Sequence, residues 1–242
     1  MNIALIGYGK MGKSIETIAL ERGHHIVARI NSETPIEKAD LSHADVAIEF
    51  SRPELALGHM RFCFSKKLPI VVGTTAWNAS ESTVLSEAKE TDAALLYASN
   101  FSIGVNLFFE LNKRLAELMQ GQAGYQAELE EIHHLQKLDA PSGTAITLAN
   151  GLMESNDDYV SWVHGENKAP HTTEGQLSVT SHRKPDVPGT HIIRYVSEID
   201  TLEISHQAHN RKGFALGAVI AAEWLFGKTG VYTMNDVLNL KK

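Results

Sequence analysis

The first hundred residues alternate short apolar runs with longer segments of helical periodicity. Apolar runs that read as buried strands lie at 2–6, 25–30, 46–50, 69–72 and 94–97, and helical patterns separate them at 11–22, 54–66 and 81–91. Strands that alternate with helices in this way are typical of a parallel, doubly wound sheet. We therefore expect an α/β domain whose ligands bind beyond the carboxyl ends of the strands.

The pattern changes after residue 104. A long helix is predicted at 105–119, strands at 128–132, 177–181, 191–196 and 201–206, and a shorter helix at 146–153. Turns that contain Gly, Pro and Asp separate most of these strands, which favours an α+β domain with a mostly antiparallel or mixed sheet of about four strands. Residues 156–175 are polar and rich in turn residues, and we expect a surface loop there.

A strongly apolar helix is predicted at 213–226, and it could close the first domain. The chain would then consist of a first domain at 1–103, completed by 211–242, and an inserted second domain at 104–210. The length of 242 residues is sufficient for two domains of this size.

A glycine-rich turn connects the first predicted strand to the first helix. It reads Gly7-Tyr8-Gly9-Lys10-Met11-Gly12, which is the G-x-G-x-x-G pattern in its required context of strand, turn, helix and strand. The first glycine allows the tight turn, the second lets a pyrophosphate approach the backbone, and the third lets helix and strand pack closely. The pattern predicts a Rossmann-type dinucleotide-binding domain with these six residues at the cofactor.

The end of the second strand decides which nicotinamide cofactor such a site accepts. An acid there binds the ribose hydroxyls of NADH and disfavours the 2′-phosphate of NADPH. This chain has Asn31 instead, with Arg29 before it and Glu33 farther along, so we expect both NADH and NADPH to be used. Two further strand ends are predicted to form the walls of the nicotinamide half, and they comprise Gly73, Thr74, Thr75, Ala98, Ser99, Asn100 and Phe101.

Composition narrows the possible classes of function. The formal net charge of −7 argues against broad nucleic-acid binding. Cys63 is the only cysteine, which excludes an internal disulfide and a thiolate metal cage. The 12 histidines show no helical i,i+4 pair with a supporting acid, and we expect no metal. Neither a signal peptide nor an apolar run of membrane-spanning length is found, so we expect a cytoplasmic protein with no membrane partner.

One short run concentrates the groups that could carry chemistry. It extends from His133 to Ala145 and contains a histidine pair, Lys137 and the turn Ser142-Gly143-Thr144. The histidines come near a strand end, and the turn opens a helix whose free backbone N–H groups form an anion site. Taken separately, such a histidine pair and such a cap are usually structural. Together, they could hold an acidic substrate and move a proton.

This run is part of a longer motif that resembles a known family. Residues 131–145 resemble the signature E-x-H-H-x-x-K-x-D-x-P-S-G-T-A of the dihydrodipicolinate reductases. The chain departs from the family pattern at Ser99, where proline is common, at 183–185, where Arg-Lys-Pro replaces R-x-G, and after the second strand, where the usual acid is missing. Other segments similar to the family lie at 7–12, 50–54, 73–75, 100–106 and 209–218.

The resemblance implies the reduction of 4-hydroxy-tetrahydrodipicolinate to tetrahydrodipicolinate, in diaminopimelate and lysine biosynthesis, with NADH or NADPH as the hydride donor. His133 would protonate the ring carbon after the hydride arrives, and Lys137 would assist as a donor and hold a carboxylate. His134, Gly143 and Thr144 would bind this small dicarboxylate, and the two domains would close to exclude water. The resemblance also implies a homo-oligomer, namely a homotetramer built on the sheet of the second domain.

Two other functions remain open from the residues alone. A different dehydrogenase on the same two-domain plan, such as one acting on an amino-acid semialdehyde, would not need His-His-x-x-Lys followed by Ser-Gly-Thr. A catalytically inactive dinucleotide sensor would keep the glycine turn, but it would have no reason to keep His133 and Lys137 together.

Overall fold

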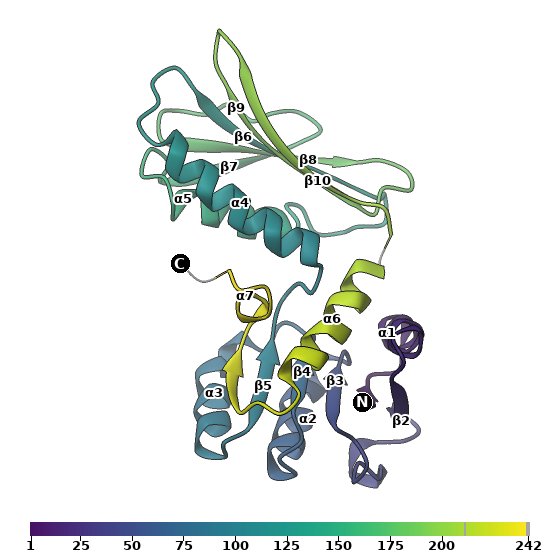
Figure 1. Ribbon diagram of the computed structural model, residues 1–242. Coiled ribbons are helices and arrows are strands. Elements are labelled where there is room, and N and C mark those ends of the chain that lie inside the picture. Colours follow the sequence, from purple (N-terminus) through teal and green to yellow (C-terminus); the bar gives the residue numbers. More distant parts are fainter. Residues whose placement is uncertain (211, 241–242) are drawn as a thin grey trace. The chain divides into compact units, whose positions relative to one another are not determined.

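The computed structural model describes residues 1–210 and 212–240. The predicted domain boundary at residue 211 and the last two residues lie outside this described part. The chain divides into two compact units (Figure 1). Met1–Ile103 and the segment from Lys212 onward form the first unit, and the chain from Gly104 to residue 210 belongs to the second. The second unit is therefore inserted into the first.

The first unit is built on a six-stranded sheet in the order β11-β5-β4-β3-β1-β2. Every pairing in it is parallel, as the alternation of strands and helices predicts. The strand order reverses between β1 and β3, which is where open α/β sheets bind their ligands. The strands are β1 (Asn2–Ile6), β2 (His25–Ile30), β3 (Val46–Glu49), β4 (Ile70–Val72), β5 (Ala94–Tyr97) and β11 (Gly230–Tyr232).

Helices cover both faces of this sheet because its central strands are apolar on both faces. Ile3 and Leu5 of β1 pack into one core with α1 and α6, whereas Ala4 and Ile6 of the same strand pack into a second core with α2 and α3. The predicted doubly wound α/β fold is confirmed. Its helices are α1 (Lys10–Glu21), α2 (Pro53–Ser65), α3 (Glu81–Glu90), α6 (Lys212–Leu225) and α7 (Met234–Val237), with short 3₁₀ turns η1 (Ile36–Lys38) and η2 (Asn78–Ser80).

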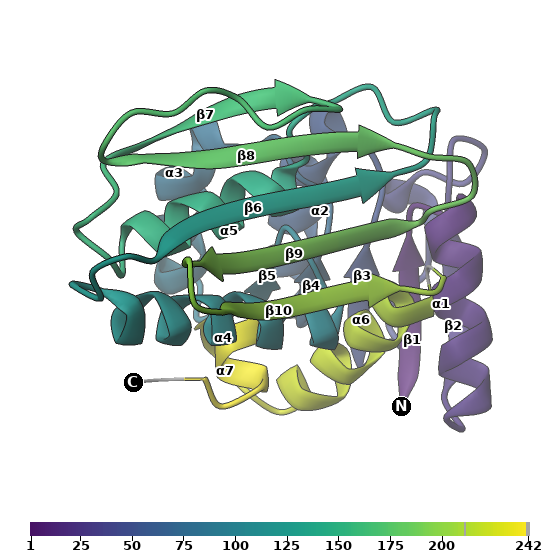
Figure 2. The same cartoon turned by 90° about the horizontal axis from the view of Figure 1, so that it is seen from above.

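The second unit is a five-stranded mixed sheet in the order β10-β9-β6-β8-β7, with two helices on one face (Figure 2). β9 is antiparallel to β6 and β10, whereas β8 is parallel to β6 and β7. Leu129, Val179 and Ile193 form the core with Phe108 and Leu148 of the helices. The elements are α4 (Ile103–Met119), β6 (Gln126–His133), α5 (Gly143–Met153), β7 (Ser161–Glu166), β8 (Gln176–Arg183), β9 (Gly189–Val196) and β10 (Thr201–Ala208).

The prediction of a plain surface loop at 156–175 is wrong in its middle part. Ser161–Glu166 forms β7, the edge strand beside β8. Its residues are only partly buried, so it lacks the apolar alternation that reveals a strand in a sequence. β11 and α7 are three and four residues long and were not predicted either. Pairing with a neighbouring strand forms β7 and β11, so their own residues alone do not reveal them.

We expect Gly217→Ala to destabilise the first unit by about 3 kcal/mol. Gly217 lies in α6 where the helix crosses the chain after β5, and an added Cβ would stand 1.7 Å from the carbonyl oxygen of Phe101. Phe101 is buried in the same core, so its backbone has little room to move. Gly213→Ala is the control, because its methyl group would meet Ser102 Oγ at an ordinary 3.5 Å. Urea unfolding midpoints measure the effect, and equal midpoints for the two variants would contradict it.

Candidate active site

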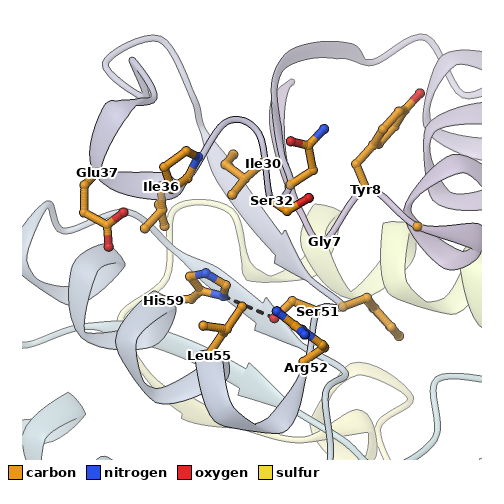
Figure 3. A pocket seen from close by; sticks show the side chains of 14 residues that line it. Gly7, Tyr8, Ile30, Ser32, Ile36, Glu37, Ser51, Arg52, Leu55 and His59 are labelled. Carbon is orange, nitrogen blue, oxygen red and sulfur yellow. Dashed lines mark hydrogen bonds between the residues drawn. The ribbon is translucent and has the colours of Figure 1, made fainter.

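A pocket of about 500 Å³ lies at the strand-order reversal of the first unit. It is lined by the glycine turn after β1 and by the residues that follow β2 and β3. Figure 3 shows Ser51, Arg52, Leu55 and His59 on one side of this pocket and residues of the 30–37 segment on the other. The pocket is therefore placed where a Rossmann-type sheet binds a dinucleotide.

The three glycines of the turn have the geometry that the motif predicts. Gly7 has a φ of +94°, and a Cβ on it would stand 2.2 Å from the carbonyl oxygen of Phe50. A Cβ on Gly12 would stand 2.4 Å from the carbonyl oxygen of Gly7, so helix and turn pack closely. A Cβ on Gly9 would meet nothing within 4 Å. Open space at Gly9 and the N-terminus of α1 beside it fit a bound pyrophosphate.

Asn31 lines the pocket, but its side-chain oxygen is used in the turn that follows β2. Its Oδ1 accepts hydrogen bonds from the backbone N–H groups of Glu33 and Thr34, at 2.8 and 2.9 Å. Glu33 does not line the pocket, whereas Glu37 does. A carboxylate that lines the pocket thus comes from the 3₁₀ turn η1, and no motif spacing points to it.

Arg29 is held by a neighbour. Its guanidinium pairs with the carboxylate of Glu16 in α1 and lies over the ring of Tyr8, 5.7 Å from the ring centroid. The Tyr8 hydroxyl donates a hydrogen bond to the same carboxylate. Arg29 and then Tyr8 hold the pKa of Glu16 below its ordinary value. Arg29 therefore supports the glycine turn through Tyr8, and its charge is balanced by Glu16.

The other predicted cofactor residues do not line this pocket. Lys10 and Met11 form the first turn of α1, and Gly73, Thr74 and Thr75 follow β4. Thr74 Oγ1 accepts a hydrogen bond from the backbone N–H of Ser51 at 2.9 Å, which ties the ends of β4 and β3 together. Phe101 is 2% exposed and packs in the core, 5.6 Å from the Phe50 ring. Ala98, Ser99 and Asn100 complete the turn after β5.

Two polar residues at or beside the pocket, Glu49 and His59, were not predicted. The Glu49 carboxylate is fully buried at the end of β3, where Ser51 donates to it and His59 Nδ1 lies 3.3 Å away. Ser51 and Arg52 follow β3 and line the pocket, as expected for the carboxyl end of a strand in such a sheet. His59 lies on α2, ten residues beyond Glu49, and only the packing of α2 on the sheet brings it to the pocket.

In the second unit, His133 is the last residue of β6 and is 7% exposed. Its Nδ1 lies 3.2 Å from Oε2 of Glu131, which points to the same side of the strand. His191 of β9 packs edge-on against it, with ring centroids 5.1 Å apart. Burial and then the proximity of His133 lower the pKa of His191 to about 3, so His191 is neutral near pH 7.

Lys137 and His134 lie in the turn that follows β6. Lys137 donates from Nζ to both carboxylate oxygens of Asp139, each at 2.8 Å, and its backbone N–H donates to the carbonyl of His134. A small cavity of about 140 Å³ lies beside Lys137, with Arg183, Ser181 and Glu166 in its wall. Arg183 donates to the carbonyls of Lys137 and Asp139, so it supports the loop that carries the lysine.

The turn at 142–144 opens α5 as predicted. Ser142 is the N-cap residue, and its Oγ accepts a hydrogen bond from the backbone N–H of Ala145 at 3.2 Å. Gly143 and Thr144 are the first helical residues, whose N–H groups have no partner within an α-helix. Gly143 is exposed and Thr144 is half-buried, so these N–H groups can receive an anion. The backbone N–H of Ser142 donates to Glu131 at 3.0 Å, which joins this turn to His133.

Glu131, His133 and His191 also place three possible metal-ligand atoms within 4.8 Å of one another. The carboxylate, however, already accepts hydrogen bonds on Oε1 from Ser142 and Ser181, and Oε2 faces His133. Two hydrogen-bond donors thus already occupy Oε1 of this carboxylate. The expectation of no metal stays a prediction.

Cys63 is buried, and burial followed by the charge of Glu49 raises the pKa of its thiol to about 12.

Within residues 1–210 and 212–240, no helix combines the length and the apolar character needed to cross a membrane.

Comparisons with known proteins agree with the geometry. A 4-hydroxy-tetrahydrodipicolinate reductase of Christiangramia forsetii is 49% identical over 241 residues, which cover 99% of this chain and 98% of the relative. The enzyme of the same name from Neisseria meningitidis serogroup C is 35% identical over 84% of this chain and 75% of its own length.

Solved structures share the fold. A dipicolinate-bound dihydrodipicolinate reductase of Paenisporosarcina sp. TG-14 superposes with a TM-score of 0.76 at 21% identity, covering 96% of this chain and 97% of that one. An aspartate semialdehyde dehydrogenase of Vibrio cholerae reaches a TM-score of 0.55 at 11% identity, covering 93% and 97% of the two chains, and it shares the fold alone.

The assignment does not depend on these pairwise likenesses alone. Residues 1–101 match the model of the dihydrodipicolinate reductase N-terminus, and residues 104–238 match the model of its C-terminus. The two models together cover nearly the whole chain, and with the relative at 49% identity they show that this chain belongs to the dihydrodipicolinate reductase family.

Proposed function

We propose that this chain reduces 4-hydroxy-tetrahydrodipicolinate to tetrahydrodipicolinate with NADH or NADPH, a step of diaminopimelate and lysine biosynthesis. Membership of the family and the named relative at 49% identity support this reaction. The observation that carries it is the link between a possible proton donor and an anion site, since Glu131 contacts both His133 and the N-terminal turn of α5. The reaction needs both groups, because its substrate is a dicarboxylate that accepts a hydride and then a proton.

The first unit is the dinucleotide-binding domain in this proposal. The turn from Gly7 to Gly12 and the N-terminus of α1 receive the pyrophosphate, and Asn31 faces the ribose end. The residues after β4 and β5, at 73–75 and 98–101, form the walls nearer the nicotinamide. When bound, the cofactor supplies the hydride.

The second unit is the substrate-binding domain. The free N–H groups of Gly143 and Thr144 and the Thr144 hydroxyl hold one carboxylate of the substrate, and His134 contributes to binding. Lys137 holds a substrate carboxylate with its charge and assists the donor. Its ammonium now binds Asp139, so substrate binding requires Lys137 either to bind both carboxylates or to release Asp139. His133 gives its proton to the ring carbon after hydride addition. The bound dipicolinate of the solved relative is a small dicarboxylate of the kind this site fits.

Assembly and location follow from the family rather than from a contact in this chain. We propose a homo-oligomer, a tetramer by the resemblance, formed on the sheet face of the second unit that bears no helix (Figure 2). On that face Arg194 pairs with Glu130 and Glu203, each at 2.6 Å. A biosynthetic enzyme that consumes NADH or NADPH is expected in the cytoplasm.

Oxidation of NADH and of NADPH, followed by absorbance with freshly generated 4-hydroxy-tetrahydrodipicolinate, tests the function. Turnover that requires this substrate supports it. A protein that binds either cofactor but oxidises neither would be a dinucleotide sensor. Aspartate semialdehyde serves as a second substrate, and a preference for it would favour a semialdehyde dehydrogenase instead.

We expect the wild type to use NADH and NADPH with kcat/KM values within roughly tenfold, about 1.4 kcal/mol. Asn31→Asp should shift the preference toward NADH. Its carboxylate can still accept the N–H groups of Glu33 and Thr34, and it replaces the amide nitrogen with a charged oxygen that repels a 2′-phosphate. Steady-state kcat/KM for the two cofactors measures the change.

Glu33→Gln is the matched control for this prediction, because Glu33 lies in the same turn but outside the pocket. It should leave the preference unchanged. A wild type that prefers NADH several hundredfold would contradict the first expectation, and it would assign the ribose contact to Glu37, the acid that does line the pocket.

A further inference from the structure

Glu131 is a carboxylate in an unusual place. It lies on β6 and is completely buried. The sheet register puts it beside Ser181 on β8 and His191 on β9, so three neighbouring strands present polar side chains side by side. Burying a carboxylate without partners is strongly unfavourable. The contacts of Glu131 therefore indicate its role.

The two oxygens of Glu131 have different partners. Oε1 accepts hydrogen bonds from Ser181 Oγ at 2.7 Å and from the backbone N–H of Ser142 at 3.0 Å. Oε2 lies 3.2 Å from His133 Nδ1 and 3.8 Å from His191 Nε2. Within the described chain, neither Oε2 nor His133 Nδ1 has a hydrogen-bond partner of regular geometry, and each is the near polar neighbour of the other. The side of the carboxylate that carries Oε2 is therefore aimed at Nδ1 of the His133 ring.

The opposite side of the His133 ring has a different neighbour. A Cβ built on Gly189 of β9 would stand 3.0 Å from Nε2, so the absence of a side chain there leaves room around this nitrogen. The ring is thus oriented with Nδ1 toward the carboxylate and Nε2 away from it. His191 is not a competing donor, because its Nε2 contacts Ser142 Oγ at 3.2 Å and its ring is neutral.

We propose that Glu131 is the positioning residue of the proton donor, holding a proton on Nδ1 of His133 so that Nε2 is the nitrogen that delivers a proton to the substrate. This inference rests on the donor role proposed for His133. In the step, the hydride adds to the conjugated ring, and the electron pair it displaces forms a C–H bond at the ring carbon as the Nε2–H bond breaks. His133 is left neutral with its Nδ1–H toward Glu131, and the solvent proton that the reduction consumes overall then reprotonates Nε2.

The same carboxylate sets the position of the substrate. Through the backbone N–H of Ser142 it holds the turn that presents Gly143 and Thr144, so the donor and the anion site share one anchor. A distance error between donor and substrate carbon is costly to the rate, and a shared anchor limits it. Glutamine at 131 could still accept from Ser142 and Ser181, so it would remove the charge while keeping the anion site.

Other charged and titratable groups surround this pair, and all of them bear on its pH dependence. On β8, Arg183 Nη1 lies 3.5 Å from Glu131 Oε1. His191 faces the pair from β9, and His206 of β10 is paired with His191 in the sheet register. Lys137 and Asp139 approach from the loop after β6. None of these is changed in the test.

The test is Glu131→Gln with steady-state kinetics across pH. We expect kcat to fall on the order of 10²-fold, because the orienting carboxylate of a catalytic histidine is worth this much or more. KM for the substrate and the Kd for NADH should stay within about threefold, since the anion site and cofactor domain are unchanged. The alkaline limb of the kcat profile should move to lower pH, because the imidazolium loses its negative partner.

Ser181→Ala is the matched control. It removes a hydrogen bond to the same carboxylate but leaves the contact with His133, so its alkaline limb should stay at the wild-type position. Glu131→Asp keeps the charge with a shorter reach, and it should lower kcat while leaving the limb in place. If the glutamine variant fails to fold, the fall in kcat of Glu131→Asp is the test of the proposal. Nitrogen shifts of ¹⁵N-labelled histidine should show His133 protonated on Nδ1 in the wild type only.

A Glu131→Gln variant with wild-type kcat and pH profile would overturn the proposal, as would the same pH shift in Ser181→Ala. The donor assignment itself is tested separately by His133→Ala. Loss of turnover in that variant, together with a normal Glu131→Gln enzyme, would remove only the positioning role. Retained turnover in His133→Ala would remove the donor role as well.

Discussion

His133→Ala is expected to bind NADH normally and to lose between roughly 10² and 10⁴-fold in kcat, the range for a lost general acid. The ring lies at the end of β6 with Nδ1 against Glu131, and the cofactor pocket belongs to the other unit. Removing the ring therefore removes the proton donor without touching the dinucleotide site. Fluorescence titration with NADH and kcat at saturating substrate separate the two properties.

His182→Ala is the control for this variant. His182 is the neighbour of Ile132 on β8, and its Nε2 lies 3.5 Å from Glu130 on the other face of the sheet. It should leave kcat close to the wild-type value. Near-normal kcat in His133→Ala would contradict the donor assignment, whatever the control shows.

Lys137→Ala is expected to raise KM and lower kcat together, with a loss in kcat/KM on the order of 10²-fold, as expected for one lost charge-assisted hydrogen bond. A charge that holds a substrate carboxylate and aids the donor acts in both the ground state and the transition state. Lys137→Arg should restore the enzyme only in part, because a planar guanidinium replaces a compact ammonium. Substrate saturation curves at fixed NADH measure both constants.

Asp139→Asn is the matched control for Lys137. It removes the carboxylate that now binds the ammonium but keeps the lysine charge, so substrate KM should not rise. An unchanged KM in Lys137→Ala would place the lysine outside the substrate site. A rise in KM in both variants would indicate that the ion pair itself shapes the loop.

The sequence by itself determined the local framework. The glycine turn lies between β1 and α1 because each glycine meets a local steric demand, as Gly7 and Gly12 show with Cβ positions 2.2 and 2.4 Å from backbone oxygens. The alternation of strands and helices predicted the parallel sheet, since most of its strands are short apolar runs separated by helices. The start of α5 at Gly143 was also readable, because a Ser N-cap acts on the residues next to it.

The tertiary structure decided which side chains meet. Glu131 contacts Ser181 and His191 only because β6 lies between β8 and β9 in a particular register, and these partners are 50 and 60 positions away in the chain. The same is true of His59, which reaches the cofactor pocket through the packing of α2, and of Glu37, which does so through η1. Periodicity reports which face of an element is apolar but not which element lies opposite. The candidate donor was therefore visible in the sequence, whereas the carboxylate contact that orients it depends on pairing between distant strands.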